Sequence, residues 1–138
     1  MGEAREAMDR TTAATTSGDR TEVGGCYAED AVLSTPDEGE LRGRDAVATY
    51  LLQLREAFPD GGYEHLNKYE DSTTAIDEGF ITGTHTGVLR LPSGESIPPT
   101  GRQIRVRSCD IAEVANGVIT HHRLYFNPAD FAEQLGLG

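Results

Sequence analysis

The chain has 138 residues, a length that suits one compact domain over residues 1–138 with a single hydrophobic core. Its 12 Lys and Arg stand against 23 Asp and Glu, and the formal net charge of -11 at pH 7 disfavours nucleic acid and anionic membranes as partners. With 37% hydrophobic and 25% charged residues, the composition is typical of a globular domain rather than of a disordered chain.

The sequence carries no recognisable targeting or disulfide signal. The first residues lack the apolar core of a signal peptide, and no stretch approaches the roughly 20 apolar residues of a membrane-spanning helix. We therefore expect a cytoplasmic protein without a membrane partner. Cys26 and Cys109 lie far apart and match no redox or zinc spacing, so we expect two buried free thiols.

The chain is predicted to begin with two short helices. Residues 3–17 read as the first, although residues 11–16 (TTAATT) are unusually polar for a helix that must pack. Gly18 provides a C-terminal stop, and Asp19 can cap a second helix that runs to Tyr27. A brief apolar run at residues 31–33 follows.

A polar loop is predicted over residues 35–43, and the clearest helical pattern follows it over residues 44–58. Asp45 is a candidate cap near the start of this helix. Its apolar residues recur at helical spacing, at Val47, Leu51, Leu54 and Phe58.

From Tyr63 onward the apolar pattern changes to a period of two. Turn signals at residues 70–72, 92–94 and 116–117 divide this region into four strands of an antiparallel meander, and residues 128–135 read as a short closing helix. Helices followed by strands predict an α+β fold in which the helices cover one face of a curved sheet.

The last predicted hairpin carries the most informative pair of residues. Asp110 lies on the apolar face of the strand over residues 102–114, and His122 lies on the more apolar face of the strand over 118–126. A two-residue turn would place Asp110 opposite Arg123, whereas a three-residue loop would place it opposite His122 and align the two apolar faces. We favour the three-residue loop.

In that register the Cβ atoms of Asp110 and His122 would lie roughly 4.5–5.5 Å apart on the concave face. A carboxylate beside an imidazole is an acid/base pair, because partial burial would raise the pKa of the carboxyl group and lower that of the ring while their attraction opposes both shifts. The same two residues could instead form an internal ion pair that fixes the strand register. Alternation alone does not separate these readings.

Three further residues are candidates for contact with a ligand. His85 lies between two glycines, which would let either a ligand or a neighbouring backbone approach closely. Tyr27 and Tyr50 are expected on the covering helices, as donors of phenolic hydroxyl groups or simply as wall residues.

No metal and no nucleotide cofactor are expected. His121 and His122 are adjacent and must point to opposite faces of a strand, and no glycine-rich phosphate loop precedes a helix. The outer face of the sheet should hold a group of residues that suits a homodimer interface better than catalysis, namely Arg105, Arg107, Arg123 and Tyr125.

Four short segments occur in an order that resembles a known family. They are residues 83–87 (GTHTG), 98–101 (PPTG), 109–111 (CDI) and 117–122 (GVITHH). This succession resembles the SnoaL-like family of the nuclear transport factor 2-like superfamily, whose members include polyketide and ester cyclases. The likeness covers most of the chain. It implies a cone-shaped, cystatin-like curved antiparallel sheet closed by helices, with an internal pocket and usually a dimer through the outer sheet face.

The resemblance also shows departures at the positions where the polyketide cyclases carry their chemistry. Those cyclases use an aspartate where this chain has Leu124, a histidine where it has Asp110 and an asparagine where it has Leu33, while His122 matches a family histidine. The departures argue against the same aldol cyclisation, because a leucine cannot exchange a proton.

A small-molecule enzyme with cofactor-free acid/base chemistry is the function that these observations predict. Asp110 would act as the base and His122 as its partner or as the acid, in a cyclisation, isomerisation or hydration of an apolar or polyketide-like metabolite. Leu33, Leu124 and Phe126 are expected in the pocket wall. The alternative is a small-molecule binding or assembly protein that keeps the fold without turnover.

Overall fold

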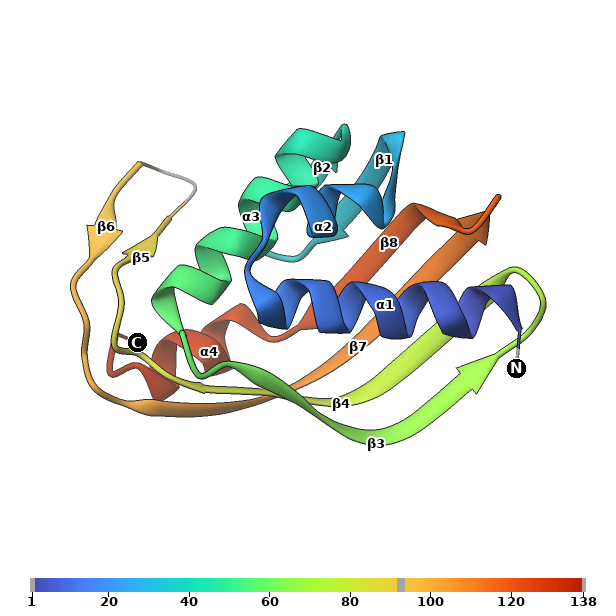
Figure 1. The fold of residues 1–138 in the computed structure, drawn as a ribbon. Helices are drawn as coiled ribbons and strands as arrows, with labels where there is room; N and C mark the ends of the chain where they lie inside the picture. The colour runs from blue at the N-terminus through green and yellow to red at the C-terminus, as the bar shows by residue number, and fades with distance from the viewer. Residues whose placement is uncertain (1, 92–93, 138) are drawn as a thin grey trace.

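The computed structural model describes residues 2–91 and 94–137, and within them one curved six-stranded sheet dominates (Figure 1). Its strand order is β2-β1-β8-β7-β4-β3. The strands of this sheet are β1 (Tyr27–Thr35), β2 (Gly39–Arg42), β3 (Gly62–Glu70), β4 (Thr74–Thr84), β7 (Gln103–Ala115) and β8 (Val118–Phe126). A small hairpin of β5 (Leu89–Arg90) and β6 (Ser96–Ile97) interrupts the connection from β4 to β7.

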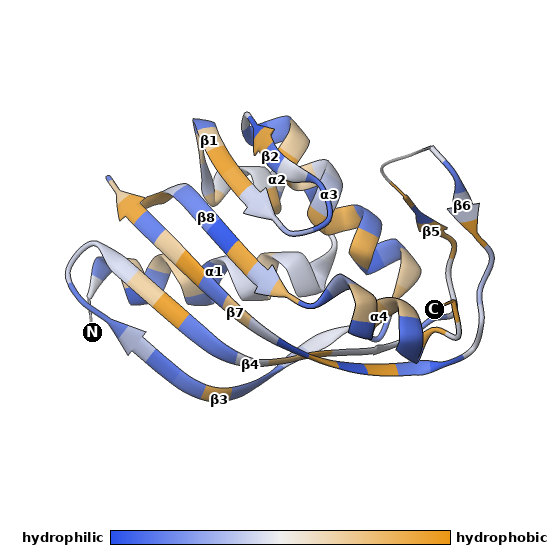
Figure 2. Cartoon of the chain, turned by 180° about the vertical axis from the view of Figure 1, so that it is seen from behind, coloured by the Kyte–Doolittle hydropathy of each residue, from blue (hydrophilic) through white to orange (hydrophobic). Residues whose placement is uncertain are grey.

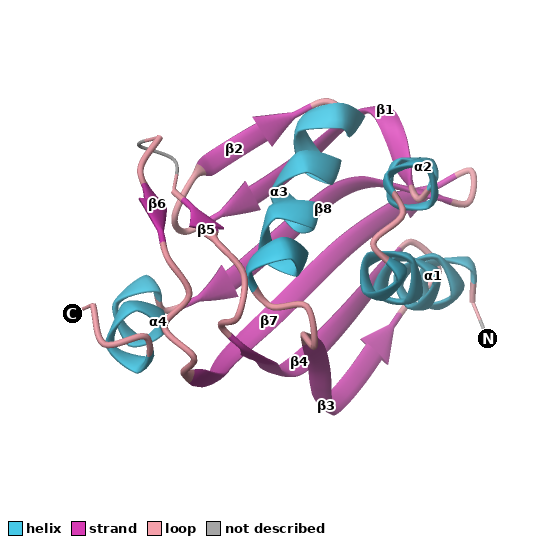
Figure 3. Ribbon diagram, turned by 60° about the vertical axis from the view of Figure 1, so that its left-hand side comes forward, coloured by secondary structure: helices cyan, strands magenta, loops and turns pink. Residues whose placement is uncertain are grey.

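Helices α1 (Glu3–Ser17) and α3 (Arg44–Ala57) lie over the same face of the sheet, as Figure 3 shows. Between them in the chain is the single turn and a half of α2 (Arg20–Gly25), and α4 (Pro128–Gln134) follows β8 near the β5–β6 hairpin. The predicted α+β arrangement is confirmed. Among the described residues, no helix has both the length and the apolar character that crossing a membrane requires.

The N-terminal helix forms over the predicted residues despite its polar stretch, because the threonines bond to their own helix. The Thr11 hydroxyl donates to the carbonyl of Ala7 at 2.8 Å, and the Thr12, Thr15 and Thr16 hydroxyls make the same bond four residues back. The helix ends at Gly18, whose φ of 75° is the left-handed conformation that glycine favours.

Several predicted element boundaries are wrong in the first half of the chain. Tyr27 does not end a helix but opens β1, where it is completely buried and pairs with Ile119 of β8 in a parallel ladder. The predicted loop over residues 35–43 contains β2, and Asp45 does not cap α3, because Gly43 with a φ of 93° occupies the N-cap position without a side-chain bond. Of the predicted turn at residues 92–94, Pro92 and Ser93 lie outside the described residues.

The register of the last hairpin is also different from both predicted registers. A two-residue turn at Asn116 and Gly117, both with positive φ, pairs Ala115 with Val118. Two residues beyond Val118, β8 carries a bulge at Thr120, so that the pairing jumps from Val114–Ile119 to Glu113–His121.

The bulge restores the alignment of the apolar faces. Without it, the two-residue turn would place Asp110 opposite Arg123, but the extra residue moves the partner of Asp110 to Leu124. Ile119 rather than Val118 or Thr120 then faces the core, followed by His122 and Leu124. Figure 2 shows the resulting alternation of hydrophilic and hydrophobic residues along β7 and β8.

Candidate active site

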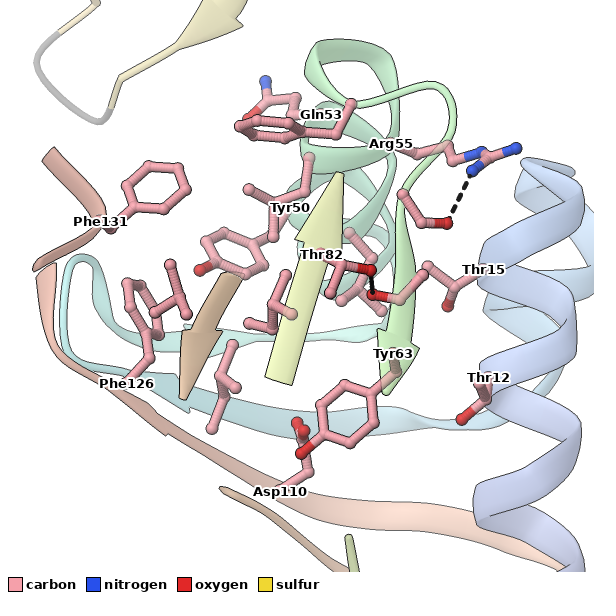
Figure 4. Close-up of a pocket in the computed structure, with 18 of the residues that line it drawn as sticks. Thr12, Thr15, Tyr50, Gln53, Arg55, Tyr63, Thr82, Asp110, Phe126 and Phe131 are labelled. Carbon is pink, nitrogen blue, oxygen red and sulfur yellow. Dashed lines mark hydrogen bonds between the residues drawn. The ribbon is translucent and has the colours of Figure 1, made fainter. Parts of the chain in front are cut away.

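A cavity of about 220 Å³ lies between the concave face of the sheet and the covering helices (Figure 4). Six of the eight residues that the sequence singled out line it, and these are Tyr27, Tyr50, Asp110, His122, Leu124 and Phe126.

Asp110 and His122 are in direct contact at the cavity wall. The Nε2 atom of His122 lies 2.7 Å from Oδ1 of Asp110. The residues are not directly opposite each other, since Asp110 pairs with Leu124 and His122 pairs with Ala112. They meet instead as diagonal neighbours on one face of the β7–β8 ladder, within reach of an aspartate and an imidazole side chain.

Tyr27 holds the other nitrogen of the ring. Its hydroxyl group lies 2.8 Å from Nδ1 of His122, and the two rings stack with their centroids 6.1 Å apart. Complete burial, followed by the nearby charge of Asp110, raises the pKa of Tyr27 well above its ordinary value, so the phenol keeps its proton. A protonated Tyr27 can donate to Nδ1, and in that arrangement the proton of a neutral His122 ring is on Nε2, facing Asp110.

Of this hydrogen-bonded chain, Asp110 is the member most open to the cavity. Its side chain is 16% exposed, against 7% for that of His122, and Tyr27 is fully enclosed. His122 uses both nitrogens on protein partners, while one carboxylate oxygen of Asp110 accepts from His122 and the second is left for another partner. A bound molecule would thus meet the carboxylate first.

The cavity has a polar side and an apolar side. Figure 4 shows Thr12 and Thr15 of α1 on one side and Phe126 and Phe131 on the other, with Asp110 between them. Because the threonine hydroxyls donate to their own helix, they present lone pairs and methyl groups to the cavity. This wall can therefore offer hydrogen-bond acceptors, rather than donors, to a bound molecule.

Tyr50 lines the cavity from α3, as predicted, but its hydroxyl group is occupied. It donates to Oδ1 of Asp37 at 3.1 Å, and burial together with the charge of Asp37 raises the pKa of Tyr50 far above its ordinary value. Tyr50 therefore contributes an apolar ring and a neutral phenol that is already bonded.

His85 and Leu33 are fully buried away from the cavity. The ring of His85 packs 5.4 Å from that of Phe58, and its Nδ1 accepts from the backbone N–H of Thr100 at 3.2 Å. The neighbouring glycine at position 87 admits a backbone rather than a ligand, since a Cβ atom there would lie 1.9 Å from the carbonyl oxygen of Glu56.

The α1 threonines, Tyr63 and Phe131 also line the cavity, although the sequence did not predict them there. Tyr63 lies on the cavity wall, and its hydroxyl group is held by the main chain of Asp77 and by Ser108. The polar run in α1 was visible in the sequence, and polar residues on the packed side of a helix are a signal for a lined cavity.

No group of three or more His, Cys, Asp or Glu side chains within residues 2–91 and 94–137 could hold a metal ion.

Comparisons with known proteins agree on family and fold. A family model described as SnoaL-like polyketide cyclase matches residues 5–135. No curated protein gives a significant sequence match.

Solved structures share the architecture at low sequence identity. A candidate SnoaL-like polyketide cyclase from Jannaschia sp. CCS1 has a TM-score of 0.83 at 14% identity, covering 99% of this chain and 93% of its own. A candidate polyketide cyclase from Streptomyces antibioticus has 0.77 at 21%, covering 96% and 98%. A candidate hydroxylase from Streptomyces galilaeus has 0.78 at 20%, covering 99% and 86%. These likenesses confirm the nuclear transport factor 2-like fold that the sequence predicted.

Proposed function

Because the chain belongs to the SnoaL-like polyketide cyclase family, we propose that it is an enzyme that moves protons on an apolar or polyketide-like metabolite without a cofactor. The observation that carries the proposal is the hydrogen-bonded chain from Tyr27 through His122 to Asp110, which ends at the wall of a cavity that is mostly apolar. Cyclisation, isomerisation and hydration all need such a proton transfer.

In this proposal Asp110 is the base. The Nε2–H of His122 donates to one oxygen of the Asp110 carboxylate and so fixes the orientation of that carboxylate. The other oxygen takes a proton from a carbon next to a substrate carbonyl, and the carboxylic acid so formed can return it at another atom. His122 orients the base and stabilises its charge.

Asp110 lies close to the position where the related polyketide cyclases carry their aspartate and this chain carries a leucine. The family resemblance places the catalytic aspartate at Leu124, and in this chain Asp110 lies directly opposite Leu124 in the β7–β8 pair. A carboxylate therefore reaches the same part of the cavity from the neighbouring strand. This supports an acid/base role with a different arrangement of groups.

We also propose that the protein forms a homodimer through the outer face of the sheet. That face carries Tyr125, 53% exposed, beside arginines that lie over Phe80. Tyrosine and arginine are the residue types that protein interfaces favour.

Deuterium exchange tests the enzyme proposal without knowledge of the product. The protein is incubated in D2O with bicyclic aryl ketones and lactones, and exchange of protons next to the carbonyl is followed by NMR. We expect Asp110→Asn and His122→Ala to reduce the exchange rate by about 100-fold or more, as loss of a general base does. A Tyr50→Phe variant, changed in the same cavity but outside the hydrogen-bonded chain, should retain it.

The alternative function is a binding protein with the same fold. If these ketones bind to the wild-type protein and to Asp110→Asn with equal affinity, and none exchanges, the enzyme proposal is wrong and binding is the better account.

A further inference from the structure

The Asp110–His122 pair is one part of a longer row of ionisable groups across the concave face. Asp77 of β4 lies directly opposite Asp110 of β7 in the strand register. Directly opposed residues have Cβ atoms about 4.5–5.5 Å apart and point to the same face. Two carboxylates this close disfavour each other's ionisation. Asp110 thus has a potential competitor for its proton on the side away from His122.

A buried arginine from the first helix meets this second carboxylate. The Nη2 atom of Arg5 lies 2.7 Å from Oδ1 of Asp77, and the two side chains are only 5% and 3% exposed. Burial lowers the pKa of Arg5, but its hydrogen bonds with Asp9 and Asp77 outweigh this effect and hold the pKa above its ordinary value. Arg5 therefore carries a fixed positive charge beneath α1.

Stability alone is a weak reason for such a pair. Replacing a buried ion pair with apolar residues of similar volume is often neutral or stabilising, because desolvation offsets the attraction. The surrounding residues of α1 on this face, Ala4, Ala7 and Met8, are apolar and fully buried. The charged pair interrupts that surface directly beside the proposed base.

We propose that Arg5 is a positioning residue that offsets the charge of Asp77, so that this second carboxylate does not oppose a negative charge on Asp110 beside His122. The consequence for catalysis rests on the proposed function, whereas the electrostatic effect itself does not.

The groups that face this region come from every element packed against it. On α1 these are Arg5 and Asp9, and Lys68 of β3 reaches Asp9. His65 of β3 lies 3.3 Å from Oδ2 of Asp77. Tyr63 of β3, His122 of β8 and Tyr27 of β1 also lie near these carboxylates, as does Cys26 just before β1. Cys109 of β7 and Glu78 of β4 are close in space but lie on the opposite face of the sheet.

The test is an NMR titration of the full chain, following the 13C resonance of the Asp110 carboxyl group, identified by its loss in Asp110→Asn. In Asp77→Asn, the charge of Arg5 is no longer cancelled at this site. We expect the titration midpoint of Asp110 to fall by about half a pH unit or more, as one charge within about 10 Å produces at an intermediate dielectric. Asp77→Ser carries the same charge change if the asparagine variant does not fold.

Two further variants decide between electrostatics and structural disturbance. Arg5→Met/Asp77→Asn removes both charges, and its midpoint should return to within about 0.2 pH units of the wild type. Asp9→Asn changes the net charge as Asp77→Asn does, but the side chain of Asp9 is 40% exposed. Because solvent screens an exposed charge, we expect Asp9→Asn to shift the Asp110 midpoint by less than half as much as Asp77→Asn does.

An Asp77→Asn midpoint that moves no further than that of Asp9→Asn, or a double variant that fails to return, would overturn the proposal. The titration needs no substrate, so it succeeds or fails independently of the exchange assay. Where exchange activity is found, the acidic limb of its pH profile should move in Asp77→Asn by the same amount as the titration midpoint.

Discussion

His122 and His85 are both buried histidines, and their partners separate a candidate catalytic group from a structural one. Both nitrogens of His122 meet ionisable side chains, Tyr27 at 2.8 Å and Asp110 at 2.7 Å. His85 meets the main chain and hydroxyl group of Thr100 and the ring of Phe58. It joins the approach to β7 to the end of α3, which is a packing role.

The pH dependence of stability should report this role of His85. Burial lowers the pKa of His85 below its ordinary value, so the unfolded chain takes up a proton at a higher pH than the folded chain does. The contribution of His85 is therefore complete above its unfolded pKa of about 6.5 and is lost as the pH falls below it. We expect His85→Gln to flatten the fall in melting temperature between pH 7 and 5.

Thermal unfolding of the two proteins across that pH range provides the measurement. His121→Gln is the matched control, because it removes an exposed histidine that pairs with Glu113 of β7, far along that strand from His85. Parallel pH profiles for the wild type and His85→Gln would show that His85 is not linked to folding.

At the scale of elements, the β7–β8 hairpin shows why the pair was predictable while its register was not. Alternation places Asp110 and His122 on the apolar faces, and the structure brings them together. Because successive side chains of a strand point to opposite faces, the pairing of β7 with β8 also had to bring their two apolar faces to the same side. A three-residue loop and a two-residue turn followed by a bulge both satisfy it, and nothing in the local pattern of residues 115–120 distinguishes them.

The first half of the chain was harder to predict for a related reason. Strand β1 forms because it pairs with β8 in a parallel ladder. The paired residues Tyr27 and Ile119 are more than 90 residues apart in the sequence. The helix-forming residues before Tyr27 gave no sign of this long-range pairing. By contrast, α1 and α3 depend on local spacing and stops, and their bounds agree with the prediction to within one residue.

The bulge leads to a prediction about a deletion. Removing Thr120 would let Ile119 and His121 follow each other without a gap, opposite Val114 and Glu113 as they already are. We expect the shortened strand to keep Asp110 opposite Leu124. The free energy of unfolding should change by about 1 kcal/mol. Nuclear Overhauser contacts between β7 and β8 would show the register.

An insertion is the corresponding control. One alanine added after Thr120 would enlarge the bulge or shift the register by one residue, which would turn the imidazole of His122 away from the cavity. The deletion variant should therefore keep the 15N shifts of the His122 ring, and the insertion variant should change them. Loss of the contact in the deletion variant would mean that the bulge itself positions His122.

At the scale of the whole molecule, strand alternation separates the cavity from the surface proposed for dimer formation. Inward residues of β7 and β8 meet the cavity, and outward residues form a surface of arginines and tyrosine. Arg105 lies 3.6 Å above the ring of Phe80 and bonds to both carboxylate oxygens of Glu64 at 3.0 Å. These contacts restrain the Arg105 side chain, which would reduce the entropy lost in the proposed association.

The proposed homodimer can be tested on this outer face without touching the cavity. Tyr125→Glu would replace the exposed aromatic side chain of the proposed interface with a charged group that association would have to desolvate. We expect it to convert a dimer to a monomer in light scattering after size-exclusion chromatography, at protein concentrations of about 10 μM. Leu137→Glu, at an equally exposed apolar residue near the C-terminal helix, should remain dimeric.

The same variant tests whether the two faces act independently. The side chain of Tyr125 points away from His122 and Leu124, since neighbouring residues of a strand face opposite sides. The titration of the Asp110 carboxyl group should therefore be unchanged in a monomeric Tyr125→Glu protein. A shifted midpoint would show that dimer formation affects the cavity through the sheet. A wild-type protein that is monomeric at this concentration would contradict the proposed dimer.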